Sequence, residues 1–433
     1  MSIVVIIAAL VLLMILTLKK VPVPIAVLIS VVVIAVFTGS DVLKTISESY
    51  MPQAASFIQS NWLLLLSGTI LSKVMDMTGA ASSIAKVIVR KLGTKRVIPA
   101  IIFSGALLAY GGINGMALCF ALYPIALTMF RQAGIPRYLI PAVLTSSLFT
   151  WIHIVPGAPI ITNAIASQSL GTNGMAAPLI GIVCAVIAVS LELVYFSYAL
   201  KKAEKKGDIF VTDEETEVIL ARCDEMEQNG TLPNPLIAVL PLLAVVLAFN
   251  VLDFELWIAM LIGAILCLVL LFKNIKGIIQ LAAGATNEAA IITLTAGTVV
   301  GIGGVISAVP GFNDMIQTIV NFGQSGGNSL MLFSSATVGL SGLLTNGMAG
   351  LMTVLDTLSQ TFLDLGVAPE LLHRIGIIAS AVLDCMPYSG GIVAIFAMTH
   401  ISYKEGYKHV AITAVVPMFI ALVVAIIMGS FLY

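Results

Sequence analysis

The chain has 433 residues, of which 59% are hydrophobic and 10% are charged, and its formal net charge is -1 at pH 7. Soluble globular chains carry about 25% charged residues, so this composition excludes an ordinary soluble domain and indicates a polytopic membrane protein. The five cysteines stand singly, without a Cys-x-x-Cys pair. They give neither a disulfide framework nor a thiolate metal site.

Simple membrane spans are predicted from the N-terminus onward. A spanning helix needs about 20 predominantly apolar residues, and the first half contains four such segments, at 2–18, 21–38, 59–77 and 176–200. The first has no basic residue ahead of it and no small-residue cleavage signal, which favours a retained helix over a signal peptide. Residues 81–92 carry apolar side chains on one face and basic side chains on the other, which predicts an amphipathic helix at the membrane interface.

Two further stretches of the first half are apolar at both ends but broken in the middle. Residues 97–130 contain Tyr-Gly-Gly-Ile-Asn-Gly at 110–115, and residues 137–168 contain His-Ile-Val-Pro-Gly-Ala-Pro at 153–159. Such backbone exposes amides and carbonyls that lipid cannot satisfy, so it is tolerated only where protein or a water-filled cavity surrounds it. We therefore predict a re-entrant hairpin over 97–130 and a discontinuous helix over 137–168.

The second half has the same order of elements as the first. A long polar stretch predicts a cytoplasmic linker at 204–233, between a first repeat at 1–203 and a second repeat at 234–433. The second half is predicted to contain spans at 235–251, 254–272, 286–308 and 408–432, a hairpin over 329–362 and a discontinuous helix over 369–400.

Short motifs recur in the two halves at nearly constant spacing. Asn-Gly-Met-Ala occurs at 114–117 and again at 346–349, 232 positions later, while Pro156 and Pro387 are 231 positions apart. Landmarks in one order at nearly one spacing indicate a duplicated domain. Internal repeats are typical of secondary transporters, whose binding site lies near the membrane midplane between the repeats.

The basic residues predict the orientation. Each half crosses the membrane five times, and an odd number of crossings inverts the second half relative to the first. With Lys19 and Lys20 cytoplasmic, all but two of the 21 Lys and Arg residues fall on or near the cytoplasmic side, which is the bias that sets orientation. Both termini are then external. Lys44 and Arg374 are the two outer basic residues, and Arg374 either attracts an anion or anchors its helix at the interface.

The predicted site lies where the two hairpin tips meet the two helix breaks. Unwound carbonyls can coordinate a cation there, and helix N-termini offer free amides and a positive dipole end to a carboxylate. A helix kink cushioned by small residues is the alternative. The candidate substrate-binding residues are Gly112, Asn114, Gly115, Thr162, Asn163, Thr345, Asn346, Gly347, Tyr388, Ser389 and Gly390.

His153 and Asp384 are the candidates for ion coupling. They are 231 positions apart, and each stands three residues before the landmark proline of its own repeat. Ionisable residues inside a membrane are costly and usually face a cavity or a partner. We predict that Asp384 takes part in proton or cation coupling, with His153 as a second titratable or substrate-contacting group. The alternative is that each residue only caps a broken helix.

The second break carries a resemblance to a known family. Leu-Asp-Cys-Met-Pro-Tyr-Ser-Gly-Gly at 383–391, followed by Lys-Glu-Gly-Tyr-Lys at 404–408, resembles the C-terminal signature of the gluconate permease family of the ion transporter superfamily. Family members read Leu-Asp-x-x-Pro-His-x-Gly there, so Tyr388 stands where His is usual. The resemblance implies an elevator-type transporter that carries a small hydroxy-carboxylate by cation symport and dimerises through scaffold helices.

These features together predict an all-α polytopic protein of the inner (plasma) membrane with two inverted repeats. We expect it to import a small organic anion, such as gluconate or 3-hydroxybutyrate, by symport with H⁺ in preference to Na⁺. No resident cofactor, metal or nucleic-acid partner is expected. A dicarboxylate or tricarboxylate transporter or an exchanger of the same superfamily is the alternative, and an intramembrane hydrolase using Ser389 is a remote one. Against the hydrolase, the chain has no His-Glu-x-x-His motif.

Overall fold

The protein is a bundle of helices. A computed structural model describes residues 2–19, 21–92, 96–113, 115–214, 216–221, 232–252, 254–271, 277–309, 321, 325, 328–344, 346–387 and 389–432. Every regular element in these ranges is helical, and no strand occurs in them. Four continuous helical segments are long and apolar enough to cross a membrane: Val42–Met77, Pro178–Lys206, Ile278–Ala308 and Tyr403–Leu432. The architecture is therefore that of a helical membrane protein.

The helices of the first half follow the order that the apolar pattern predicts. They are α1 (Ser2–Leu18), α2 (Val23–Thr38), α3 (Val42–Lys44), η1 (Thr45–Tyr50), α4 (Met51–Met77), α5 (Ala80–Leu92), α6 (Val97–Tyr110), α7 (Gly115–Ala133), η3 (Arg137–Leu139), α8 (Ile140–Leu148), η4 (Trp151–Ile154), α9 (Ile161–Leu170) and α10 (Pro178–Lys206). The predicted hairpin corresponds to α6 and α7. The predicted discontinuous helix corresponds to η3, α8, η4 and α9.

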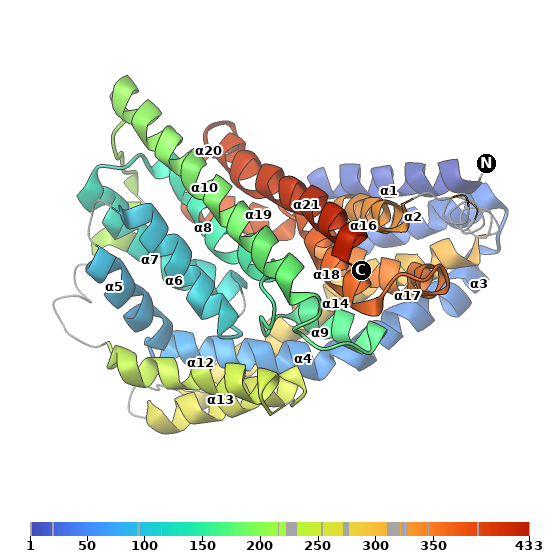
Figure 1. Ribbon diagram of the computed structural model, residues 1–433, viewed down its shortest axis with the longest axis horizontal. Helices are drawn as coiled ribbons and strands as arrows, with labels where there is room; N and C mark the ends of the chain where they lie inside the picture. Colours follow the sequence, from blue (N-terminus) through green and yellow to red (C-terminus); the bar gives the residue numbers. More distant parts are fainter. Residues whose placement is uncertain are drawn as a thin grey trace.

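The described helices of the second half run from α12 to α21. They are α12 (Pro235–Asn250), α13 (Leu256–Leu270), α14 (Ile278–Ala308), α16 (Ser329–Leu343), α17 (Gly347–Asp364), α18 (Pro369–Val382), α19 (Gly390–Thr399), α20 (Tyr403–Val410), η6 (Ala411–Val415) and α21 (Val416–Leu432). Figure 1 shows α4 crossing the lower part of the view, with α12 and α13 beneath its left portion. The hairpin α6–α7 lies at the left of this view and α16–α17 at the right.

Three helices begin earlier in the chain than the spans predicted for them. Helix begins at Val42 where 59–77 is predicted, at Ile278 where 286–308 is predicted, and at Tyr403 where 408–432 is predicted. Hydropathy marks only the stretch that matches lipid. Helical hydrogen bonding continues through the polar residues beyond it, because these residues also form helix when their side chains reach water or protein.

The helix α14 approaches η1 and the adjoining α4 through glycine. A Cβ on Gly301 would lie 2.7 Å from the Tyr50 ring, and a Cβ on Gly304 would lie 2.4 Å from the Ser49 carbonyl oxygen. Lys73 and Glu288 join the other ends of the same helices in a salt bridge of 2.9 Å. Small residues allow helix backbones to approach closely inside membranes, so these glycines set the crossing of α4 and α14.

Replacing Gly304 by alanine is expected to destabilise this crossing. The new methyl group meets a backbone oxygen, which cannot rotate away, so α14 must move from η1 at a cost of about 1–3 kcal/mol. Thermal unfolding of the purified protein in detergent measures the loss. Gly339→Ala is the matched control, because a Cβ at this helical glycine meets nothing within 4 Å. Equal melting temperatures for the two variants would contradict the proposed role of Gly304.

The described part of the central linker is held against the first broken helix. The Arg137 guanidinium donates to the Asp213 carboxylate and to the Thr216 hydroxyl, and the Tyr138 hydroxyl donates to Asp208 at 2.9 Å. The hydrogen bond from Arg137 holds the pKa of Asp213 well below its usual range. The stabilisation is thus present above the ordinary pKa of an aspartate and is lost only as pH falls through the lowered value.

Replacing Arg137 by alanine is expected to release the linker. Asp213 then loses the cation that binds it, and residues after Asp208 become accessible to protease several-fold faster at neutral pH. Limited proteolysis of the purified protein, followed by mass spectrometry of the fragments, measures this. Lys205→Ala, at the exposed C-terminal turn of α10, is the control. The role of Arg137 is excluded when both variants are cleaved at the wild-type rate.

Candidate functional site

The tip of the second hairpin is capped by its own asparagine. Asn346 precedes α17, and its Oδ1 accepts a hydrogen bond from the Ala349 backbone amide at 3.0 Å. This satisfies one of the free amides of the first helical turn.

This tip is seated directly on the second helix break. The Gly347 backbone amide donates to Asp384 Oδ1 at 2.6 Å, and a Cβ on Gly347 would lie 2.7 Å from the Ser380 carbonyl oxygen. Only a glycine allows this approach of the tip to the end of α18. A carboxylate at a helix N-terminus also interacts favourably with the helix dipole. Asp384 therefore attaches the tip of the second hairpin to the second helix break.

The first helix break contacts both the first hairpin and the second break through Phe149. A Cβ on Gly115, at the start of α7, would lie 3.1 Å from the Phe149 ring, and a Cβ on Gly391 would lie 3.7 Å from it. The Phe149 carbonyl is 4.0 Å from Cys385 Sγ. We call Gly115, Phe149, Gly347, Asp384 and Gly391 the central junction. In it, residues of both hairpin tips and both breaks come together.

His153 lies next to this junction. Its ring centroid is 6.2 Å from that of Phe149, and its backbone amide donates to the Thr150 carbonyl at 3.0 Å within the short helix η4. The His153 side chain is only partly buried. Of the two predicted coupling residues, His153 lies beside Phe149, and Asp384 directly precedes Cys385, whose thiol lies 4.0 Å from the Phe149 carbonyl.

Two helices at the breaks begin without a side-chain cap. Ile160 precedes α9 and Ser389 precedes α19, and neither side chain bonds the following amides. The Thr162 hydroxyl in the first turn of α9 is buried and has no hydrogen-bond partner among the described residues. Gly390 begins α19, beside the Gly391 of the junction. Such N-termini offer amides to an anion.

Asn163 belongs to a buried polar network, not to the central junction. Its Nδ2 donates to the carbonyls of Ala158 and Gly174 at 2.9 and 3.2 Å, and its Oδ1 is 2.7 Å from His373 Nε2. These contacts use both amide protons of Asn163. They fix the loop after the first break against α18.

Arg374 completes this network and is not on the outer surface. Its side chain is 0% exposed. The guanidinium donates to the carbonyls of Ala176 at 2.9 Å, Gly174 at 2.9 Å and Ile154 at 3.3 Å. The expectation that Arg374 attracts an external anion or anchors the helix at the interface is therefore wrong. Carbonyls of the first break and of the loop between α9 and α10 accept from the guanidinium, which explains why a buried cation is tolerated here.

Gly112 faces a different part of the molecule from Gly115. Its φ is +86°, which a glycine adopts readily, and a Cβ there would meet Val245, Leu71 and Met260 at 3.3 to 3.6 Å. Gly112 therefore lies among apolar side chains of α4, α12 and α13. Three other predicted site residues, Asn114, Thr345 and Tyr388, lie outside the described residues.

Sequence reasoning did not single out Phe149 or Glu192. Phe149 carries no polar signal, and only the fold reveals that its ring joins three segments. Glu192 had a signal, because it is the one charged residue in the predicted span 176–200. Such a residue in a spanning helix marks a functional candidate.

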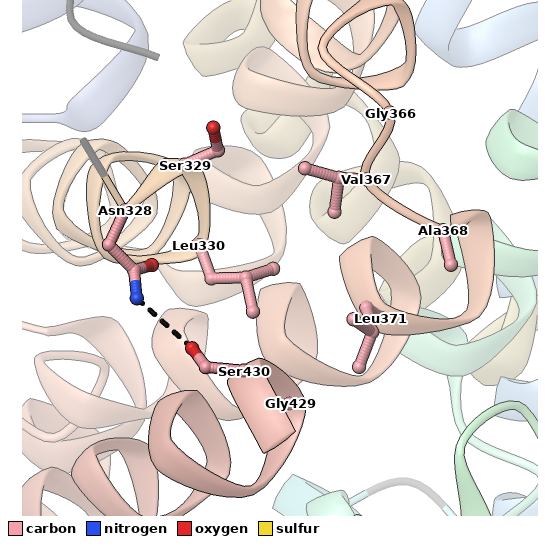
Figure 2. Close-up of a pocket in the computed structure, with 9 residues that line it drawn as sticks. All are labelled: Asn328, Ser329, Leu330, Gly366, Val367, Ala368, Leu371, Gly429 and Ser430. Atoms are coloured by element: carbon pink, nitrogen blue, oxygen red, sulfur yellow. Dashed lines mark hydrogen bonds between the residues drawn. The ribbon is translucent and has the colours of Figure 1, made fainter. Parts of the chain in front are cut away.

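A surface hollow of about 280 Å³ lies away from the central junction. It is formed at the ends of α16, α18 and α21, and Figure 2 shows Asn328 donating to Ser430 across it at 3.0 Å. None of the predicted site residues lines it. Among the described residues, no group of three or more His, Cys, Asp or Glu side chains is placed to hold a metal ion.

Comparison with known proteins assigns this helical membrane protein to a class. The relatives that it matches over most of their length are transporters by name, and the protein is accordingly a membrane transporter. The chain is 29% identical over 433 residues to the uncharacterized transporter YxjC of Bacillus subtilis (strain 168), covering 89% of this chain and 90% of the relative. It is 26% identical over 400 residues to an uncharacterized transporter of Haemophilus influenzae, covering 90% of each. No family model matches the chain.

Proposed function

We propose that the protein is a secondary active transporter that imports a small organic anion by cation symport. The central junction is the observation that carries the proposal, because it joins residues of both hairpin tips and both breaks around Phe149. Broken helices of this kind supply the binding sites of transporters near the membrane midplane. The resemblance to the gluconate permease family favours a hydroxy-monocarboxylate, such as gluconate or 3-hydroxybutyrate, and H⁺ in preference to Na⁺.

Two features support an anionic substrate in this arrangement. The first turns of α9 and α19 carry amides without a side-chain cap, and a carboxylate satisfies such amides while it interacts with the helix dipole. The buried Thr162 hydroxyl, which has no hydrogen-bond partner in the described part of the chain, adds a polar group at the start of α9. The proposed coupling residues are Asp384, which holds the second hairpin tip, and His153, which lies beside Phe149.

Inverted repeats and an elevator-type movement are part of the proposal. The order hairpin, broken helix and closing helix occurs in both halves, and the two hairpins lie toward opposite ends of the elongated molecule in Figure 1. The remaining helices α1, α2, α4, α12, α13 and α14 pack on one another and form the proposed scaffold. A homodimer through this scaffold, in the inner membrane with both termini external, completes the proposal.

The histidine contacts argue against an intramembrane hydrolase. His373 is bonded to Asn163 and Thr172, and His409 is bonded to Tyr195. Within the described residues no hydrogen bond joins Ser389 to a histidine. A nucleophile and its base lie within hydrogen-bond reach in such enzymes.

Uptake into proteoliposomes tests the proposed function. The purified full-length protein is reconstituted, and labelled gluconate, 3-hydroxybutyrate, a dicarboxylate and a tricarboxylate are supplied under separately imposed H⁺ and Na⁺ gradients. We expect accumulation of a hydroxy-monocarboxylate under the H⁺ gradient. If neither gradient drives accumulation and the protein only exchanges substrate across the membrane, it is an exchanger and not a symporter. Preference for a dicarboxylate or tricarboxylate would replace the proposed substrate class.

A further inference from the structure

Glu192 is a carboxyl-bearing residue inside α10, the helix that closes the first half. It is the only charged residue between Pro178 and Leu200, and its side chain is 0% exposed. Neither of its carboxyl oxygens has a hydrogen-bond partner among the described residues. An ionised carboxylate without a partner is very costly in such surroundings. These buried surroundings therefore favour the protonated, neutral form of the Glu192 carboxyl.

Two hydroxyls of the first broken helix lie beside this carboxyl. They belong to Ser146 and Thr150, and both residues are fully buried. Thr150 Oγ1 donates its proton to the Ser146 carbonyl at 3.0 Å, so it can only accept from Glu192. Ser146 Oγ has no hydrogen-bond partner of its own among the described residues and can donate. A neutral carboxyl needs one acceptor and one donor, and these hydroxyls supply one of each.

The elements packed against α10 bring few other titratable groups to Glu192. They are η4, η6 and α21, of which η6 and α21 carry no titratable side chain and η4 carries His153. Further along α10, the hydroxyl of Tyr195 is 2.8 Å from His409 Nδ1. No basic side chain in these three packed elements other than His153 is therefore available to neutralise a charged Glu192.

The second break supplies the remaining titratable groups. The Cys385 thiol lies within electrostatic range of both Asp384 and Glu192. Cys385 directly follows Asp384 in the second break. Glu192 is therefore directed toward the segment whose Asp384 holds the second hairpin tip.

We propose that Glu192 is a proton-binding residue of the transport cycle, an inference that rests on the proposed symport. The carboxylate takes a proton from water when the site opens to one side, and the neutral acid is enclosed between Ser146 and Thr150. The O–H bond breaks when the site opens to the other side, and the proton passes to water there. A sodium ion fits less well, because it needs several oxygens in place of its hydration shell.

Carbodiimide labelling tests proton binding without a substrate. Dicyclohexylcarbodiimide reacts with protonated carboxyls in apolar surroundings, and mass spectrometry locates the adduct in the purified full-length protein. We expect an adduct on Glu192 that fades as pH rises, whereas Glu204, which is exposed on the same helix, stays unlabelled. Thr150→Val removes the acceptor for the Glu192 proton, so labelling of Glu192 is expected to be lost at a lower pH than in the wild-type protein. The proposal would be overturned if Glu192 were unlabelled at every pH or labelled equally at every pH. It would also be overturned if Na⁺ at constant pH protected Glu192 from labelling.

Transport by Glu192→Gln separates this inference from the proposed function. Glutamine resembles the permanently neutral acid, so exchange is expected to persist while accumulation under a pH gradient falls by about tenfold or more. Glu204→Gln is the control and keeps wild-type accumulation. Accumulation by Glu192→Gln at the wild-type level overturns the role of Glu192 alone. Absence of gradient-driven uptake by the wild-type protein overturns symport, and with it the cycle proposed for Glu192, while the labelling still reports whether the residue binds a proton.

Discussion

Replacing Arg374 by alanine is expected to prevent the protein from reaching its stable fold. The guanidinium donates to three buried carbonyls, that of Ile154 in the first helix break and those of Gly174 and Ala176 in the loop between α9 and α10. Its removal leaves the Ile154 and Ala176 carbonyls without this donor, whereas the Gly174 carbonyl still accepts from the Gly157 amide and from Asn163. Each buried unsatisfied group costs about 1–3 kcal/mol, so we expect a total loss of roughly 2–6 kcal/mol.

Arg374→Lys tests whether the shape of the guanidinium matters as well as its charge. An ammonium group is a compact point charge without the planar fork that reaches several acceptors at once, so we expect the lysine variant to recover only part of the stability. Size-exclusion chromatography and thermal unfolding in detergent measure both variants. Lys44→Ala is the control, since Lys44 is exposed. If Arg374→Ala had the melting temperature of the wild-type protein, the carbonyls would have found other donors, and the proposed role of Arg374 would be wrong.

The order of the helices could be predicted because apolar length and Gly or Pro breaks determine it locally. The ranges predicted for the hairpins, 97–130 and 329–362, contain the turn between α6 and α7 and the turn between α16 and α17. The helix ends were less predictable, as at Val42. There the helix already includes polar residues, whereas the apolar stretch that predicted it starts only at residue 59.

The partners of the polar residues could not be predicted, because they depend on contacts between the two halves. Arg374 was assigned to the outer surface by counting crossings, yet carbonyls from a segment about 200 residues earlier surround it. Asn163 and His373 meet in the same way. A sequence pattern indicates that a break exposes carbonyls, but it does not say which distant side chain satisfies them.

The position of Phe149 in the central junction could not be predicted from the sequence either. Gly115 was predicted to be a site residue, and Gly391 follows the predicted site residue Gly390, but the side chain of their shared neighbour Phe149 carries no charge or hydrogen-bonding group. Its position follows from the packing of α8 against α7 and α19. Contacts between packed side chains are set by the whole fold, so a single apolar residue gives no local signal.

Replacing Asp384 by asparagine is expected to uncouple transport while it leaves the fold intact. The asparagine oxygen can still accept from the Gly347 amide, so the second hairpin tip stays on its break. The side chain can no longer exchange a proton or carry the charge that binds a cation. Coupling between two ligands is typically about 1–3 kcal/mol, which corresponds to roughly 5-fold to 150-fold. We expect gradient-driven accumulation to fall within that range while exchange continues.

Asp384→Ala separates coupling from attachment of the hairpin. Alanine removes the acceptor as well as the charge, so the Gly347 amide loses its partner and the melting temperature is expected to fall, unlike that of Asp384→Asn. Asp364→Asn, at the exposed end of α17, is the control for a charge change on the same half. Uptake in proteoliposomes under an imposed gradient is measured beside thermal unfolding. Coupled uptake by Asp384→Asn at the wild-type rate and with the wild-type pH dependence would reduce Asp384 to a cap on the hairpin.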